Sequence, residues 1–360
     1  MQCINRSAGV AADTGTPFLP SLTPCKTAAT MHFELQIFAT KEFLILNADK
    51  RPELVTLGHA AVDIGTKVGT FPEPDTKLLA EELSLQGGGP AATAAAAASR
   101  LGVRTAFLGT VGDDFYGQFI KNEFEKDGVN ISGLITRPGT SSPLSLIIVQ
   151  PLAATRTIIW SRGTSGVLSP NEIDNEIIGN AKCLLVDGHH MDASIAAART
   201  AREHDVPVVF DAGSMKPDTE KLLEYVDHLI ASQIFAEEFT GHDDPGAALL
   251  EFSKQGFRHV AITSGEKGVF FLKRKHLHYQ RAFPVAAIDT TGAGDVFHGA
   301  YAFGLVQDFN MSDCVEVAAA AAAMKCTKLG ARAAMPTLEE LDGFLRKKKA
   351  NISGKRKLKK

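Results

Sequence analysis

The chain has 360 residues, of which 44% are hydrophobic and 22% are charged, and its formal net charge is -3. A chain of this length can bury one large core without disulfide bonds. A net charge this close to neutral excludes a strong positive electrostatic field that would attract nucleic acid or an anionic membrane. The expected partner is therefore a small molecule.

The cysteines also limit the class of protein. The five of them, at positions 3, 25, 183, 314 and 326, form no Cys-x-x-Cys pair. This spacing argues against a disulfide framework and against a zinc site, and it favours a reducing, cytoplasmic compartment. No apolar run approaches the roughly 20 residues that cross a bilayer.

The two ends of the chain differ from the middle. Residues 1–50 mix Ser, Thr, Pro and Ala without periodic apolar spacing, so we expect a poorly ordered extension. A transit peptide and a start codon assigned too far upstream are the alternatives. Residues 347–360 are rich in Lys and predict a solvated basic tail, with nuclear targeting or nucleic acid contact as the alternative.

From Leu54 onward, short runs of Val, Ile and Leu alternate with helical stretches. This alternation is typical of an α/β fold in which helices cover a mostly parallel sheet. The expected strands are 54–58, 106–109, 183–186, 206–211, 228–231 and 259–263. The expected helices are 91–101, 115–126, 193–204, 246–255, 293–306, 313–327 and 338–348.

Two β-rich segments, 144–149 and 156–160, interrupt the alternation. They are separated by a short loop and predict a hairpin rather than a strand-helix unit. Together with the chain after Asp63, they predict a small β lid built from about 63–80 and 143–161.

The most informative segment is DTTGAGD, residues 289–295, which precedes an apolar helix. A glycine-rich turn that opens a helix presents unpaired N–H groups at the positive end of the helix dipole, where they can hold phosphate oxygens. Asp295 falls on the first turn of that helix, where its carboxylate can accept a proton from an attacking hydroxyl. The alternative is an ordinary tight turn whose aspartates cap the helix.

The longer string DTTGAGDVFHGA, residues 289–300, resembles the C-terminal motif of the PfkB, or ribokinase-like, carbohydrate kinases. The segment GGGPAA at 87–92 resembles the first motif of that family, and residues 109–117 resemble its GxVGDDxxG segment. The resemblance spans roughly 54–344 and implies a three-layer α/β/α kinase domain at 51–346. It also implies an ATP-dependent sugar kinase that phosphorylates a primary hydroxyl of a ketohexose-like sugar, with Mg²⁺ held mainly through the ATP phosphates.

The resemblance assigns roles to individual residues. Asp295 is the implied base, and the N–H groups of Gly292, Ala293 and Gly294 form the implied anion hole. The implied substrate contacts are Asp63, Lys77, Gly87, Gly88, Gly89, His189 and Arg162. The implied nucleotide contacts are Thr263, Gly265, Gly268, Thr291 and Gly330, and a monovalent cation such as K⁺ is implied at Asp289. A strand-end cap for Asp63, a backbone-bonded histidine at 189, an exposed loop arginine at 162 and a plain turn at 263–268 stay open as alternatives.

The chain departs from the family pattern in three places. Ser232-Gln233-Ile234-Phe235 stands where the family often has Asn-x-x-Glu, so metal binding is expected to rely on phosphates, waters and acids such as Asp211 or Asp295. Pro90 and Thr93 replace the Lys and Asn of ribokinases, which argues against a ribose-specific site. Ala334 stands where ribokinases can offer a hydroxyl to the cation.

Within the family, the motifs most closely resemble those of the sulfofructose kinases. The stretch Asp187-Gly188-His189-His190 lacks the arginine with which those enzymes would grip a sulfonate. A nucleoside or other small-alcohol kinase, and a catalytically silent sugar-binding relative, are the alternative functions. A homodimer formed through the lid is a further expectation.

Overall fold

The computed structural model describes residues 51–150, 155–257, 259–273 and 276–357. The expected extension at 1–50 lies outside the described residues, as do the last three residues of the expected basic tail. All of the described residues belong to one compact unit. Along the described part of the chain, no helix combines the length and the apolar character that crossing a membrane requires.

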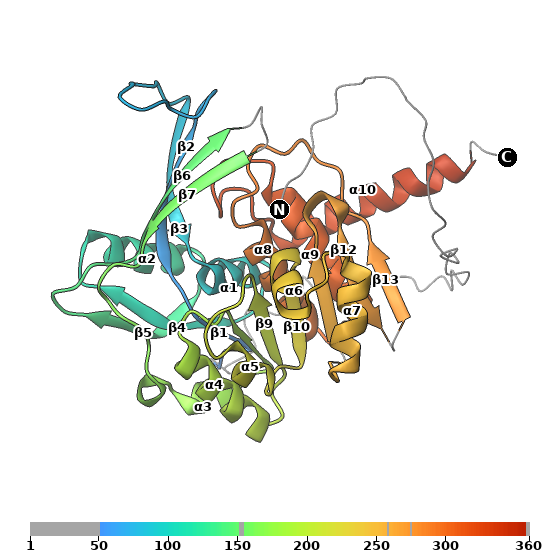
Figure 1. Ribbon diagram of the computed structural model, residues 1–360, viewed down its shortest axis with the longest axis horizontal. Coiled ribbons are helices and arrows are strands. Elements are labelled where there is room, and N and C mark those ends of the chain that lie inside the picture. The colour runs from blue at the N-terminus through green and yellow to red at the C-terminus, as the bar shows by residue number, and fades with distance from the viewer. Residues whose placement is uncertain (1–50, 151–154, 258, 274–275, 358–360) are drawn as a thin grey trace. The chain divides into compact units, whose positions relative to one another are not determined.

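The middle layer is a nine-stranded sheet (Figure 1). Its strands are β1 (Leu54–Leu57), β4 (Thr105–Gly112), β5 (Asn130–Arg137), β8 (Cys183–Val186), β9 (Val208–Ala212), β10 (His228–Ser232), β11 (His259–Thr263), β12 (Val269–Lys273) and β13 (His276–Gln280). The spatial order is β13-β12-β11-β10-β9-β8-β1-β4-β5. Strands from β11 to β5 pair in parallel, whereas β12 pairs antiparallel with β11 and with β13.

All six strands predicted for this sheet are present, and β5, β12 and β13 were not predicted. Two of the missed strands, β5 and β13, are the edges of the sheet. Edge strands expose part of their surface, so they lack the continuous apolar run by which buried parallel strands are recognised.

Helices cover both faces of the sheet. One face carries α1 (Pro90–Arg100), α2 (Phe115–Lys126), α8 (Ala293–Val306), α9 (Met311–Lys325) and α10 (Leu338–Lys357). The other carries α3 (Asn175–Gly179), α4 (Met191–Glu203), α5 (Thr219–Leu223), α6 (Gln233–Thr240) and α7 (Pro245–Lys254). Successive strand residues point to opposite faces, so Val209 joins the first core and Val208 the second. The predicted three-layer α/β/α fold is confirmed.

The predicted helices agree with the structure to within two residues at each end, except for the last one. That helix was expected to stop at Lys348, but α10 continues to Lys357. Most of the expected basic tail is therefore a continuation of α10. The short helices α3, α5 and α6 were not predicted.

A second, four-stranded sheet stands apart from the first (blue and green in Figure 1). It consists of β2 (Ala61–Lys67), β3 (Glu82–Gly88), β6 (Leu144–Gln150) and β7 (Thr155–Ser161), in the order β3-β2-β6-β7. The predicted hairpin is β6–β7. The small sheet begins at Ala61 and includes β3, which the predicted boundary at residue 80 had left out.

One hydrogen-bonded side chain joins the small sheet to a distant loop. Gln86 of β3 donates from Nε2 to the carbonyl of Leu329 (3.2 Å), and its Oε1 accepts from the backbone N–H groups of Arg332 (2.9 Å) and Ala333 (3.1 Å). The loop at 329–333 is therefore held against the root of the small sheet.

Candidate active site

A cavity of about 680 Å³ lies at the carboxyl ends of the parallel strands, next to the small sheet. Its lining includes His59 after β1, His189 after β8, Asp211 of β9 and Thr263 of β11. The side chains of the small sheet that reach it come from one face, because Asp63, Ser145 and Trp160 lie opposite one another in register. Open parallel sheets bind their ligands in this position.

The glycine-rich turn before α8 is fixed by Asp289. This buried carboxylate accepts from the backbone N–H (2.8 Å) and the hydroxyl (2.7 Å) of Thr291 through Oδ1, and from the N–H of Gly330 (2.8 Å) through Oδ2. Gly292 has a φ of 73°, and a Cβ there would lie 2.8 Å from the Cβ of Ala331. The turn therefore requires glycine and rests directly against the loop that contains Gly330.

One member of the expected anion hole has a partner within the turn. The N–H of Ala293 donates to the carbonyl of Thr290 at 3.2 Å. The contribution of Ala293 to phosphate binding stays a prediction. A Cβ on Gly294 would meet no atom within 4 Å outside its own helix, which leaves this part of the backbone open towards the cavity.

Three carboxylates with raised pKa values share the cavity. Burial, followed by the charge of Asp211, raises the pKa of Asp295 to about 7. Burial, followed by the charge of Asp187, raises the pKa of Asp211 to about 7, and burial raises the pKa of Asp63 to about 6. Carboxylates whose charge is disfavoured by burial and by one another are typical of functional sites.

His298 of α8 connects the turn to Asp211. Its Nδ1 lies 2.6 Å from the carbonyl oxygen of Gly294 and 3.3 Å from Oδ2 of Asp211. The shorter contact defines the hydrogen bond, and among the described residues Oδ2 of Asp211 has no hydrogen-bond partner although it is buried. This oxygen is available to a ligand that enters the cavity.

Asp187 organises the far end of the cavity. This buried carboxylate accepts from the backbone N–H groups of His59 (2.8 Å), His189 (2.9 Å) and Ala91 (3.1 Å). Burial alone would raise the pKa of Asp187, but the charge that His189 carries when it is protonated and the N–H groups of His59 and His189 lower it. An ionised Asp187 thus ties the loops after β1 and β8 to the first turn of α1.

An aromatic wall follows from this arrangement. The rings of His59 and His189 stack with their centroids 4.9 Å apart, and Trp160 of β7 meets His59 edge to face at 6.5 Å. Burial, followed by the charge of His189, lowers the pKa of His59 to about 4, and burial also lowers the pKa of His189. The two rings are therefore neutral near pH 7. Arg162 lies over Trp160 at 5.3 Å and is exposed.

Arg156 of β7 is a site residue that the sequence reasoning missed. Its Nη1 donates to the hydroxyl of Thr290 at 2.7 Å, and its Nε is buried without a hydrogen-bond partner among the described residues. A guanidinium from the small sheet thus reaches the glycine-rich turn. The only signal was an arginine at the start of the second strand of the predicted hairpin, where it was one polar residue among several.

The cavity brings most of the predicted site residues together. Those that line it are Asp63, Gly89, His189, Thr263, Gly265, Thr291, Gly292, Gly294 and Asp295. Gly87 and Gly88 end β3, and Gly268, whose φ is 91°, closes the turn after β11.

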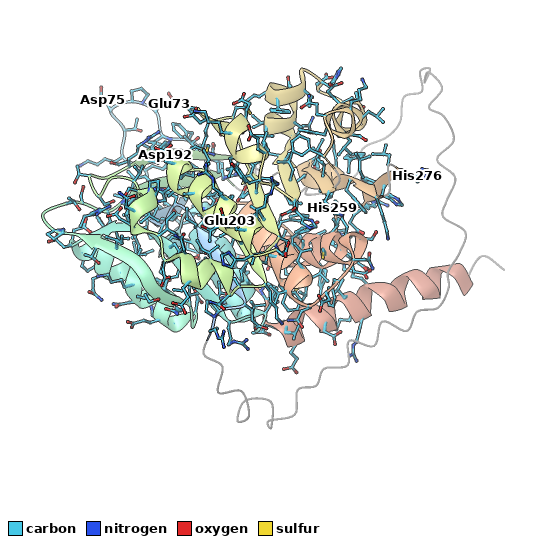
Figure 2. The ribbon with its side chains drawn as sticks, turned by 90° about the horizontal axis from the view of Figure 1, so that it is seen from below. Glu73, Asp75, Asp192, Glu203, His259 and His276 are labelled. Atoms are coloured by element: carbon cyan, nitrogen blue, oxygen red, sulfur yellow. The ribbon has the colours of Figure 1, made fainter. Side chains whose placement is uncertain are left out.

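Lys77 lies elsewhere. It is exposed in the loop between β2 and β3, the loop whose residues Glu73 and Asp75 are labelled in Figure 2, and it is not among the described residues that line the cavity. Its role in substrate binding stays a prediction.

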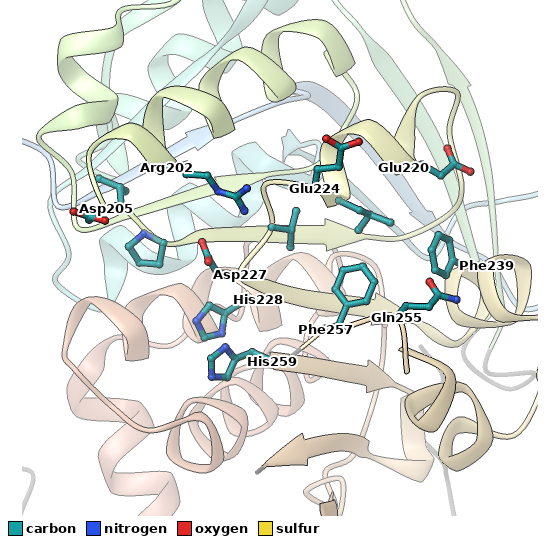
Figure 3. A pocket seen from close by; sticks show the side chains of 15 residues that line it. Arg202, Asp205, Glu220, Glu224, Asp227, His228, Phe239, Gln255, Phe257 and His259 are labelled. Atoms are coloured by element: carbon teal, nitrogen blue, oxygen red, sulfur yellow. The ribbon is translucent and has the colours of Figure 1, made fainter. Parts of the chain in front are cut away.

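A larger cavity, of about 880 Å³, lies at the opposite, amino ends of β9, β10 and β11 (Figure 3). The rings of His228 and His259 stack in it at 4.5 Å, and Nδ1 of His228 lies 2.9 Å from the hydroxyl of Tyr301. The glycine-rich turn and the carboxylates with raised pKa values are at the other ends of the strands. The smaller cavity is therefore the candidate active site.

Comparison with known proteins gives the family. The profile of the pfkB family carbohydrate kinases matches residues 51–338. The chain belongs to this family. The ribokinase of Haemophilus influenzae is 30% identical over 303 residues, which cover 82% of this chain and 99% of that protein. The 5-dehydro-2-deoxygluconokinase of Clostridium botulinum is 25% identical over 334 residues, which cover 85% of this chain and 96% of that protein.

Solved structures agree. The ribokinase of Thermotoga maritima superposes with a TM-score of 0.70 at 26% identity, covering 82% of this chain and 99% of that one. The ribokinase of Arabidopsis thaliana, complexed with ribose and ATP, gives a TM-score of 0.71 at 25% identity, again covering 82% and 99%. This pfkB family member is thus a phosphotransferase with an alcohol group as acceptor, as the sequence motifs predicted.

Proposed function

We propose that this pfkB family kinase phosphorylates a primary hydroxyl of a ketohexose-like sugar, with Asp295 as the general base. The observation that carries the proposal is the meeting of Asp295, the turn at Gly292 and Asp63 in one cavity. These groups supply a proton acceptor, an anion site and a sugar contact from three separate elements.

The chemistry follows from the positions of these groups. A carboxylate with a pKa of about 7 is well matched to accept the proton of a hydroxyl near neutral pH. The backbone N–H groups of Gly292 and Gly294, at the positive end of α8, would stabilise the transferring phosphoryl group, and Arg156 adds a positive charge from the small sheet. The small sheet would act as a lid that excludes water and limits ATP hydrolysis.

The nucleotide would lie on the other side of this turn. Thr263, Gly265 and Gly268 form the loop after β11, and glycines there allow the backbone to run close to the ATP phosphates. The residues present fit a Mg²⁺ ion, because the unpaired, buried Oδ2 of Asp211 is a hard oxygen donor. When bound, Mg²⁺ would neutralise charge on the ATP phosphates.

The residues that line the cavity indicate which class of substrate it can bind. Pro90, which replaces the Lys of ribokinases, lines the cavity, so this position offers no ammonium group to a ribose ring. The stacked, neutral His59 and His189 offer hydrogen bonds to sugar hydroxyls without a fixed positive charge. A nucleoside is the second candidate substrate, because a base can stack on the wall formed by these rings and Trp160.

We also propose that the outer face of the small sheet forms a homodimer. On the side away from the cavity, Leu83 is 73% exposed, Ile159 56%, Leu146 43% and Leu85 42%. Apolar side chains gathered on one sheet face typically mark an interaction surface, and two copies of the same face can pair symmetrically.

The test is ADP release by the purified protein with ATP, Mg²⁺ and a panel of acceptors at matched concentrations. The panel contains ketohexoses, their sulfonated and deoxy analogues, ribose and adenosine. We expect the highest kcat/KM with a ketohexose-like sugar and no turnover when its primary hydroxyl is removed. A higher kcat/KM with adenosine would support the nucleoside, and a thermal shift with sugar but no turnover would support a silent binding protein.

A further inference from the structure

The resemblance to the pfkB family implies a monovalent cation beside the anion-binding turn, near Asp289, Thr291 and Gly330. The oxygen atoms of Asp289 at that place already accept hydrogen bonds. The carboxylate of Asp289 uses three of its roughly four lone-pair positions on Thr291 and Gly330. The backbone carbonyl of Asp289 accepts a hydrogen bond of 2.7 Å from the Nζ of Lys325.

Lys325 is an unusual residue for a protein core. It is 0% exposed and is among the largest fully buried side chains of the described residues. A buried ammonium group is costly unless it is paired, and lysine is almost never fully buried without such a partner. The cost of burying the ammonium group of Lys325 must therefore be offset by favourable electrostatic interactions.

The surroundings of Lys325 provide such interactions. It is the last residue of α9, where the negative end of the helix dipole favours a cation. Burial lowers the pKa of Lys325, and the charge of Asp289 and, to a smaller extent, that of Asp295 act against this shift. The ammonium group lies within hydrogen-bond distance of the backbone of Asp289, at the start of the glycine-rich turn.

We propose that the ammonium group of Lys325 takes the place of the monovalent cation and acts as a positioning residue for the anion-binding turn. By holding the carbonyl of Asp289, Lys325 fixes the residue whose carboxylate joins Thr291 to Gly330. Its charge also adds to the positive potential that attracts phosphate oxygens. This inference rests on the proposed kinase function, but it also predicts a response to salt that needs no turnover.

The first experiment uses the unmodified protein. Turnover and thermal melting are measured in potassium, sodium and choline chloride at equal ionic strength. We expect turnover and melting temperature to be the same in all three salts, because the position is filled from within the chain. Activation or stabilisation by K⁺ over choline would overturn the proposal.

The second experiment removes the charge. Lys325→Met keeps a side chain of similar length and removes the charge, at a cost in stability because one partner of a buried polar contact is lost. We expect kcat to fall about tenfold or more, as when one stabilising group of an anion site is lost, with the KM for the sugar little changed. We also expect K⁺, but not choline, to raise the melting temperature of this variant, because an ion that binds only the folded state stabilises it.

The matched control is Lys328→Met, which removes an exposed charge three residues away. It should behave as the unmodified protein does in every salt. Unchanged kcat in Lys325→Met, or a melting temperature that does not respond to K⁺, would contradict the proposal. If the unmodified protein has no kinase activity, the proposed function fails while the melting data still decide the role of Lys325. If Lys325→Met does not fold, Lys325→Arg, which keeps the charge, and the salt series on the unmodified protein decide it.

Discussion

Asp295→Asn tests whether Asp295 of α8 acts as a general base or only as a helix cap. Asparagine preserves the size of the side chain at the edge of the cavity, but it cannot accept a proton. General-base contributions are typically around 10²- to 10⁴-fold, so kcat should fall by about that factor. Asn and Asp cap helices comparably well, so a residue that serves only as a cap would leave kcat nearly unchanged.

The same substitution should stabilise the protein at high pH. The pKa of Asp295 is raised from 3.8 to about 7, so the folded state holds this proton more tightly than the unfolded state does. The associated stability is present at low pH and is lost as the pH rises from about 4 to about 7. At about 1.4 kcal/mol per pKa unit, ionising Asp295 at pH 8 costs up to about 4 kcal/mol. Asp211 and Asp295 titrate as a coupled pair. We therefore expect Asp295→Asn to recover about half of this cost, or roughly 2 kcal/mol of stability.

The assay is steady-state kinase turnover together with thermal melting at pH 8 and pH 4. A gain of roughly 2 kcal/mol corresponds to a rise in Tm of about 4 °C at pH 8, and we expect almost no gain at pH 4. Asp313→Asn is the control, because it removes an acid from the first turn of α9, away from the cavity. The general-base assignment would be refuted if folded Asp295→Asn kept more than about a tenth of the turnover, or if it gained no stability at pH 8.

Three further sets of substitutions test Arg156, Lys77 and the outer face of the small sheet. Arg156→Met should lower kcat about tenfold to a hundredfold, as expected for a lost phosphate contact, and Arg156→Lys should retain more of the activity. If both variants have the kcat of the unmodified protein, Arg156 has no role in the reaction. Lys77→Ala should raise the KM for the sugar several-fold and leave the KM for ATP unchanged. A raised KM for ATP with an unchanged KM for the sugar would assign Lys77 to the nucleotide site instead. Replacing both Leu83 and Leu146 with Lys should give a monomer by light scattering, and a dimer that persists would place the interface elsewhere.

The fold was largely predictable because buried parallel strands have a strong local signal. The strand at Cys183–Val186 consists of four apolar, fully buried residues, and its predicted bounds are the observed ones. The sequence of β3, ELSLQGG, alternates and ends in glycines, and it was not among the predicted strands. Its partner in the sheet, β2, is what makes it a strand.

The site was only partly predictable. Asp295 and Gly294 lie within one short motif, so their proximity follows from the sequence itself. Arg156 reaches Thr290 across 134 residues, and Lys325 reaches Asp289 across 36. Such contacts are set by how the small sheet and α9 pack, and no spacing along the chain indicates them.

The three hydrogen bonds of Gln86 limit how this protein can change through evolution. The loop at 329–333 is held by two residues from different parts of the chain. Gln86 forms hydrogen bonds near both of its ends, and Asp289 accepts from the N–H of Gly330 within it. A side chain at position 330 would clash with the amide of Gln86, and one residue more or less in the loop would shift the glycine-rich turn relative to the small sheet. We therefore expect homologues to preserve the length of this loop strictly, and to exchange residues 86 and 330 only together.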